Sequence, residues 1–320
     1  MQKEDAISIE YLEEPARFAD LINGFIYHGR ELIRPEDIME KNRTKTRITK
    51  EQGRIQSQTI TADIVREVRF CMRVAVIALE NQSEIHYAMP IRIMNIEAAN
   101  YHRQWRKRAK QHRQDKDLRG AAFLSGFSKE DKLVPTITIV VYFGKEPWDG
   151  PRSIKEMMDL ETYPPEFRDM VVDYPIHILE VRKYPRLEDF HTDLQYVFGF
   201  LQNAEDKEAL HAYITAHNEV FEDLSEDAYD MISVMSHSEE LQNIRKTYDG
   251  QGGHDMCQAI KEMIEDGRLD GRREGRQEGI QALVETCKEL GITKETTLSK
   301  LQEKFALGDS AEEYLERYWA

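Results

Sequence analysis

The sequence contains no long hydrophobic run. No stretch of its 320 residues approaches the roughly 18 uninterrupted apolar residues that a membrane-spanning helix needs. The opening segment, residues 1–5, also lacks the apolar core of a secretion signal. We therefore expect a protein of the cytoplasm that has no membrane partner.

Cysteine is scarce as well. The three cysteines, Cys71, Cys257 and Cys287, are an odd number without a close pair. This excludes a disulfide framework and a four-ligand zinc site, so reduced, buried thiols are expected. Two histidines, His86 and His102, have no partner at metal-ligand spacing. A phosphate-binding loop and a nucleophile–base pair are also missing, which argues against a small-molecule enzyme.

Positive charge is in deficit over the whole chain but not everywhere along it. The chain carries 44 Lys+Arg against 59 Asp+Glu, a formal net charge of −15. Residues 41–54 nevertheless hold six cations and one acid, and residues 103–119 hold eight cations and two acids. Acidic residues accumulate after about residue 204. Each basic cluster is either a solvated loop or helix end, or a surface that binds an anionic partner.

Hydrophobic periodicity predicts a mixed α/β fold. The spacing within Arg17–Tyr27 favours a helix, and residues 64–70 and 73–82 favour two strands joined as a hairpin. Apolar residues then recur at helical spacing after Pro90. This predicted buried stripe consists of Ile91, Met94, Ala98, Tyr101 and Trp105. Further strands are expected at residues 134–143 and 174–181, and an all-helical region is expected from Leu187 onward.

Four glycines recur at a period of four in the C-terminal part, at Gly267, Gly271, Gly275 and Gly279. Each weakens a helix by about 1 kcal/mol relative to alanine. Two interpretations remain open. The segment is either a flexible charged linker or a helix whose small residues allow close self-association and a homo-oligomer.

Three polar residues end the most hydrophobic strand, at Glu80, Asn81 and Gln82. The two-residue period of a strand places Glu80 and Gln82 on one face and Asn81 on the other. Asp63 begins the preceding strand, so hairpin pairing brings its carboxylate toward Glu80. Two carboxylates and a carbonyl oxygen suit Mg²⁺ or Mn²⁺. Taken alone, such a strand end is more often the start of a solvated loop.

Four segments together resemble a known family. They are residues 61–68 (TADIVREV), 79–84 (LENQSE), 87–92 (YAMPIR) and 135–144 (PTITIVVYFG). Their order and spacing resemble the recombination-promoting nuclease or putative transposase family, a bacterial branch of the PD-(D/E)XK nuclease superfamily. The resemblance covers roughly residues 15–200, and it implies a core of αβββαβ type.

The resemblance also assigns roles to residues of this chain. It implies that Asp63, Glu80 and the main-chain carbonyl of Asn81 hold the metal, and that Gln82 stands in the place of the superfamily's lysine. Asp20 on the first helix becomes a candidate for an additional acid. Glutamine lacks the positive charge of lysine, so the expected activity is weak.

These expectations combine into a Mg²⁺-dependent DNA endonuclease of little sequence specificity, associated with recombination or transposition. The DNA-binding cations are then sought in both basic clusters and at the start of the following helix. They are Arg92, Arg103, Arg106, Lys107, Arg108, Lys110, Lys45 and Arg47. Such phosphate contacts predict binding that depends steeply on salt.

The alternative is a catalytically inactive protein of the same fold that binds DNA or serves in assembly. The expected division of the chain is a nuclease-like domain at residues 1–200 and a helical region at 201–260. The repeat and a small helical tail follow at 261–320. On this division, DNA binding belongs to a fragment that ends near residue 200.

Overall fold

The computed structural model describes residues 3–40, 44–51, 54–70, 73–238, 241, 256–305, 307 and 310–319. The chain divides into two compact units, Met1–Asp255 and Met256–Ala320. The boundaries expected after residues 200 and 260 fall inside helices α6 (Leu194–Asn203) and α11 (Met256–Glu289). The compact units therefore differ from the three expected parts.

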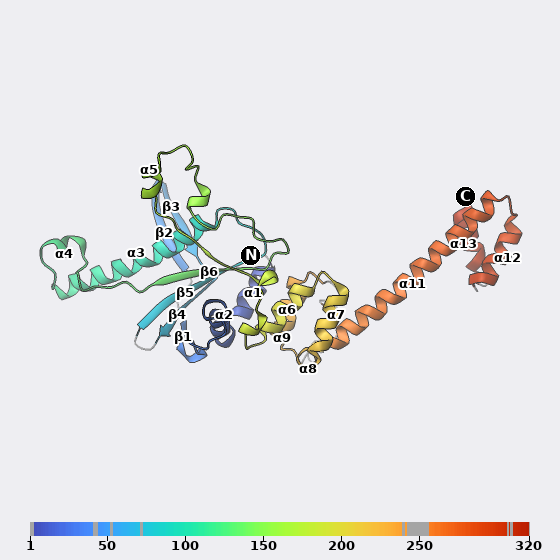
Figure 1. Ribbon diagram of the computed structural model, residues 1–320, viewed down its shortest axis with the longest axis horizontal. Helices are drawn as coiled ribbons and strands as arrows, with labels where there is room; N and C mark the ends of the chain where they lie inside the picture. The colour runs from blue at the N-terminus through green and yellow to red at the C-terminus, as the bar shows by residue number, and fades with distance from the viewer. Residues whose placement is uncertain are drawn as a thin grey trace. The chain divides into compact units, whose positions relative to one another are not determined.

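The first unit combines one mixed sheet with helices (Figure 1). Its other α-helices are α1 (Lys3–Glu13), α2 (Pro15–Tyr27), α3 (Met89–Asp115), α4 (Gly120–Ser125), α5 (Pro165–Met170), α7 (Lys207–Ala216), α8 (Asn218–Glu222) and α9 (Glu226–Met235). Short 3-10 helices are η1 (Pro35–Asp37), η2 (Lys155–Met157), η3 (Val181–Lys183) and η4 (Leu187–Asp189). The α/β class expected from the sequence is confirmed.

Five strands form the main sheet in the order β1-β4-β5-β6-β7. They are β1 (Ile38–Glu40), β4 (Ile64–Phe70), β5 (Arg73–Gln82), β6 (Thr136–Tyr142) and β7 (His177–Glu180). The expected hairpin is confirmed, because β4 and β5 pair antiparallel with Ile64 opposite Leu79. Strand β6 then runs parallel to β5, which requires a crossover, and α3 lies within that connection.

The first basic cluster lies largely in a second sheet rather than in a loop. Strands β2 (Thr44–Glu51) and β3 (Arg54–Thr61) pair antiparallel, with Thr44 opposite Thr61. Over residues 44–48, threonine and isoleucine alternate with Lys45 and Arg47, and this two-residue period is the signal of a strand. The hairpin was not predicted, because dense positive charge is also typical of a solvated loop.

Helix α3 buries a different face from the one predicted. Ile91 and Trp105 are exposed by 43% and 40%, so the predicted apolar stripe is wrong. The buried face instead carries Met89, Ile93 and Ile96 together with two polar residues, Glu97 and Asn100. Glu97 accepts a hydrogen bond from the backbone N–H of Thr138, and the Asn100 amide donates to the hydroxyl of Thr136. These partners on β6 stabilise polar groups that a hydrophobic pattern assigns to solvent.

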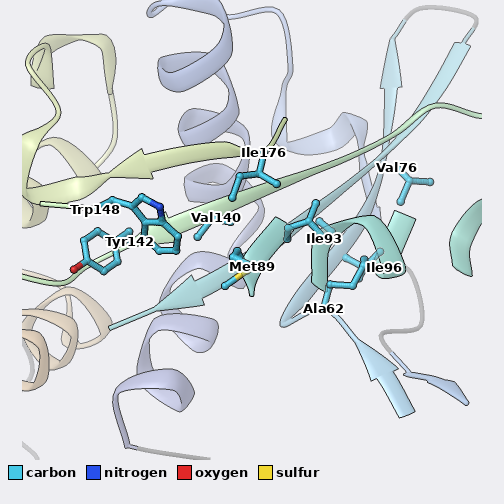
Figure 2. Packing of buried hydrophobic residues seen from close by; sticks show 11 residues of the cluster. Ala62, Val76, Met89, Ile93, Ile96, Val140, Tyr142, Trp148 and Ile176 are labelled. Atoms are coloured by element: carbon cyan, nitrogen blue, oxygen red, sulfur yellow. The ribbon is translucent and has the colours of Figure 1, made fainter. Parts of the chain in front are cut away.

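The core between α3 and the sheet is continuous. Figure 2 shows Met89, Ile93 and Ile96 of α3 beside Ala62, Val76 and Val140. The Tyr142 and Trp148 rings meet edge to face at 5.3 Å between their centroids. Even-numbered residues of β5, such as Val76 and Ala78, belong to this cluster, so Glu80 points toward the same side.

A buried arginine joins four helical segments of the first unit. The guanidinium of Arg17 on α2 donates to Asp193 at the start of α6 and to Asp227 on α9. It also lies 4.2 Å from the centre of the Tyr11 ring on α1. The α6 residues Leu194, Val197, Phe198 and Leu201 are buried, and this α-helix begins at Leu194 rather than at Leu187 as expected.

The second unit consists of α11, α12 (Lys294–Phe305) and α13 (Ser310–Trp319) around a small apolar core. That core contains Ile280, Val284, Leu301, Ala311 and Leu315. The glycine repeat lies within α11, so its backbone is helical and the interpretation as a flexible linker is wrong. Self-association through this helix stays a prediction.

Two further expectations can be compared with the described residues. Cys287 is a free, buried thiol, as predicted, whereas Cys71 lies outside the described residues. None of the helices, as far as the structure describes them, is both long and apolar enough to cross a membrane.

Candidate functional site

The β4–β5 hairpin brings Asp63 and Glu80 to one end of the sheet. Asp63 directly precedes β4, and the register that pairs Ile64 with Leu79 places it opposite Glu80. The Asp63 carboxylate accepts a hydrogen bond of 2.9 Å from the backbone N–H of Asn81. The expected approach of the two acids is therefore present, and a backbone donor fixes the orientation of Asp63.

Glu80 is fully buried, and only one of its two carboxylate oxygens accepts a hydrogen bond from a described residue. Its Oε2 accepts a 2.7 Å hydrogen bond from Nε of Arg92, whereas its Oε1 is buried and has no hydrogen-bond partner among the described residues. Burial and, secondly, the neighbouring Asp63 charge raise the pKa of Glu80, whereas Arg92 lowers it, and together these effects bring the pKa to about 7. A buried carboxylate oxygen without a donor is costly, so this atom needs a proton or a cation.

Arg92 also belongs to this site. The sequence places it among the candidate DNA-binding cations, and in the structure its guanidinium pairs with Glu80. It lies on the first turns of α3, where Met89 and Pro90 begin the helix directly after the β5 turn. Its side chain remains 40% exposed, so its outer face is accessible to solvent.

Asn81 and Gln82 point in different directions, as the strand period predicts. The Asn81 side chain donates a 3.0 Å hydrogen bond to the hydroxyl of Ser8 on α1. Gln82 is partly exposed and donates a 2.7 Å hydrogen bond from Nε2 to the main-chain carbonyl of Asn81. That carbonyl, expected to hold a metal, already accepts one bond and keeps a second lone pair. Ser8 carried no sequence signal.

The donor set suits a hard divalent cation but is small. Asp63, Glu80 and the Asn81 carbonyl supply only oxygen atoms, which Mg²⁺ and Mn²⁺ prefer. Among the described residues, no group of three or more His, Cys, Asp or Glu side chains is placed to hold a metal. A Mg²⁺ ion normally retains several waters, so two carboxylates and one carbonyl are enough. The unpartnered Glu80 Oε1 is the observation that favours a bound cation.

Asp20 has a structural task in this chain. Its carboxylate accepts hydrogen bonds from the backbone N–H groups of His191 and Thr192 and from the Thr192 hydroxyl. The hydrogen bonds given to Asp20 thus hold the segment before α6. Among the described residues, Asp20 does not form a metal-binding group with Asp63 and Glu80. Its assignment as an additional acid came from the family resemblance.

The second basic cluster occupies the distal half of α3. Arg106, Lys107 and Lys110 are exposed, and no described residue forms an ion pair with them. Two other candidates are engaged: Arg103 donates to Asn100, and Arg108 forms an ion pair of 3.1 Å with Asp131. Three of the five expected cations are therefore available to an anionic partner. Lys45 and Arg47 lie on β2, and their side chains are outside what the structure describes.

Comparison of the chain with protein-family models, with curated proteins and with solved structures gave no match. The candidate site is thus supported by its geometry and by the sequence resemblance alone.

Proposed function

We propose that this protein is a divalent-metal-dependent DNA endonuclease of PD-(D/E)XK type, with Asp63 and Glu80 at its centre. The observation that carries the proposal is the buried Glu80 Oε1, which accepts no hydrogen bond from the part of the chain that the structure describes and lies beside a second carboxylate. An enzyme that binds Mg²⁺ or Mn²⁺ gives this oxygen a partner.

The order of elements supports the finer fold assignment. Helix α2 is followed by β1, the β4–β5 hairpin, α3 and β6, in the order αβββαβ. Hairpin β2–β3 is an insertion between β1 and β4, and it forms a separate sheet. The candidate acids lie at the β4–β5 hairpin, where the resemblance places them.

In this proposal Asp63, Glu80 and the carbonyl of Asn81 hold the metal. When bound, the ion lowers the pKa of a water and neutralises charge on the scissile phosphate. Arg92 fixes one oxygen of Glu80 and leaves the other for the ion. The Asn81 N–H orients Asp63, and Gln82 orients the attacking water once its amide leaves the Asn81 carbonyl.

A second candidate function is a non-catalytic DNA-binding or assembly protein of the same fold. It is favoured by the contacts of Arg92 and Gln82, because these neutralise Glu80 and occupy the Asn81 carbonyl without a metal. Glutamine also provides no positive charge to stabilise the phosphate in the transition state.

A plasmid-nicking assay distinguishes the two functions. Supercoiled DNA is incubated with Mg²⁺ or Mn²⁺ and with the native chain, Asp63→Asn or Glu80→Gln. We expect nicking by the native chain and at least about a hundredfold less by either variant, since each loses a metal-binding charge. Glu84→Gln is the matched control, because Glu84 is exposed and lies two residues after Gln82.

Equal nicking by the native chain and both site variants would show that Asp63 and Glu80 take no part in DNA cleavage. Retention of DNA without nicking by any of the proteins would establish the non-catalytic function.

A further inference from the structure

Helix α4 folds back against the distal half of α3 (Figure 1). The indole Nε1 of Trp105 donates a 3.0 Å hydrogen bond to the carbonyl of Ser125 at the end of α4. Gly126 follows at φ 66° and lies so close to Ala109 that a Cβ there would be 2.7 Å from the alanine methyl. The contact between the two helices thus requires glycine, and it fixes the plane of the Trp105 ring.

The two helices enclose a groove of about 650 Å³, which we call the α3–α4 groove. It is lined by His102, Trp105, Arg106, Ala109, His112, Arg113, Lys116, Leu118, Phe123, Leu124, Ser125 and Gly126. Two aromatic rings in it are strongly exposed, Trp105 by 40% and Phe123 by 66%. Three of its lining residues are cations and none is acidic. A shallower hollow of about 520 Å³ adjoins it and is lined by Arg106, Lys110, Arg113 and Gln114.

The acids near this groove already have partners. Asp131 accepts from Arg108 and from Nε2 of His112, and Asp117 accepts from Nδ1 of the same imidazole. Asp115 accepts from the amide of Gln111. No described carboxylate forms an ion pair with Arg106, Lys110 or Arg113, although the chain as a whole is acidic.

We propose that the α3–α4 groove binds single-stranded DNA, with bases stacked on Trp105 and Phe123 and phosphates on the row of cations beside them. Exposed aromatic rings next to a positive track are the combination by which proteins hold unpaired strands. In a duplex the faces of the bases are stacked on one another and cannot receive these rings. The inference rests on the proposed action on DNA, and it adds that the preferred substrate contains an unpaired segment.

The test is a binding measurement on the full chain in EDTA, where no metal-dependent cleavage occurs. Fluorescence anisotropy is recorded with three labelled probes: oligothymidylate of about 16 nucleotides, an abasic strand of equal length and a duplex of that length. We expect the oligothymidylate to bind about tenfold more tightly than the abasic strand, because only the former offers bases to stack.

Two variants separate stacking from charge. Phe123→Ala is expected to weaken oligothymidylate binding about tenfold and to leave the abasic strand unchanged. Arg113→Ala is expected to weaken both probes. Phe167→Ala is the matched control, because Phe167 on α5 is also a half-exposed aromatic ring but lies outside the groove.

Three results would overturn the inference: equal affinity for oligothymidylate and the abasic strand, tighter binding of the duplex, or unchanged binding by Phe123→Ala. Displacement of oligothymidylate by polyglutamate at equal charge would also overturn it and would indicate an acidic-peptide site.

The outcome of these binding measurements does not depend on whether the protein cleaves DNA. If nicking requires Glu80 but Phe123→Ala has no effect, only this inference fails; if the variants behave as expected and no protein nicks DNA, only the nuclease proposal fails.

Discussion

Glu80 determines the behaviour of the candidate site because its surroundings oppose its negative charge. Burial and the neighbouring Asp63 both raise its pKa, and Arg92 compensates only in part. A carboxyl with a pKa of about 7 is evenly divided between its charged and neutral forms at neutral pH. The raised pKa of Glu80 and the lack of a described hydrogen-bond partner for its Oε1 have the same cause. The buried carboxylate is stable only when a proton or a cation neutralises it.

Glu80→Gln is expected to stabilise the metal-free protein at alkaline pH. The pKa of Glu80 is raised from 4.5 to about 7, so between these values the unfolded chain releases a proton that the folded chain keeps. The free energy of unfolding therefore falls as pH rises through this window, by up to about 3 kcal/mol. Glutamine removes this penalty, and we expect a gain of about 1–3 kcal/mol at pH 8 and a smaller gain at pH 5.

Urea unfolding of the first unit in EDTA at the two pH values measures this difference, with Glu84→Gln as the control. An equal gain at both values would show that the effect does not come from the titration of Glu80.

At the level of single residues, the sequence could predict the acids but not their partners. Asp63 and Glu80 were found because a hairpin register is set by local spacing. The contact of Arg92 with Glu80 depends on how α3 enters over the sheet, and the Asn81–Ser8 hydrogen bond joins residues 73 positions apart. Asp20 was misplaced because the partners of a helical acid are determined by tertiary packing, here by the His191–Thr192 backbone.

Helix packing in the first unit depends on a close contact at Gly24 of α2. A Cβ added at Gly24 would lie 2.4 Å from the ring of Phe190, which is fully buried and cannot move away. Alanine favours a helix by about 1 kcal/mol, but overpacking of this kind typically costs about 1–3 kcal/mol. We expect Gly24→Ala to lower the free energy of unfolding despite its better helix propensity.

Gly275→Ala provides the matched control for that prediction. Gly275 is also a helical glycine, but a Cβ there meets no atom of the described residues within 4 Å, so alanine should stabilise α11. Thermal unfolding followed by circular dichroism compares the two variants. Equal stabilisation by both substitutions would contradict the close packing of α2 against Phe190.

At the level of elements, strongly periodic segments were predictable and polar faces were not. The β4–β5 hairpin and strand β6 follow from apolar spacing, and both are present. The buried face of α3 was mispredicted because Glu97 and Asn100 are buried through hydrogen bonds to β6. The glycine repeat is helical even though its intrinsic propensity is poor, and packing of the C-terminal part of α11 on α12 and α13 contributes to this.

For the whole molecule, the net charge of −15 conceals where positive charge is presented. Exposed cations without a described ion-pair partner gather on the distal half of α3. A fragment ending near residue 200 would lack α9, and the buried guanidiniums of Arg17 and Arg182 would lose their contacts with Asp227 and Met235. We therefore expect DNA binding from a fragment that ends near residue 255 rather than near residue 200.

We expect the chain ending at residue 255 to bind single-stranded DNA with a steep salt dependence. About four phosphate contacts predict a loss of affinity on the order of 50-fold between about 50 and 200 mM salt. Anisotropy titrations at several salt concentrations provide the slope. Binding by this fragment that hardly changes with salt would contradict the role of the α3 cations.

If Glu80 keeps one oxygen for a divalent cation, its substitution must weaken Mn²⁺ binding, which titration calorimetry measures. Near pH 6.5 the Glu80 carboxyl is largely protonated, so Mn²⁺ binding should release a proton. The released proton is detected because the measured heat then depends on the ionisation enthalpy of the buffer. We predict that the native chain and Glu84→Gln bind Mn²⁺ with proton release, and that Glu80→Gln binds it at least about tenfold more weakly. Equal Mn²⁺ affinity of the native chain and Glu80→Gln would show that the Glu80 carboxylate is not a metal ligand.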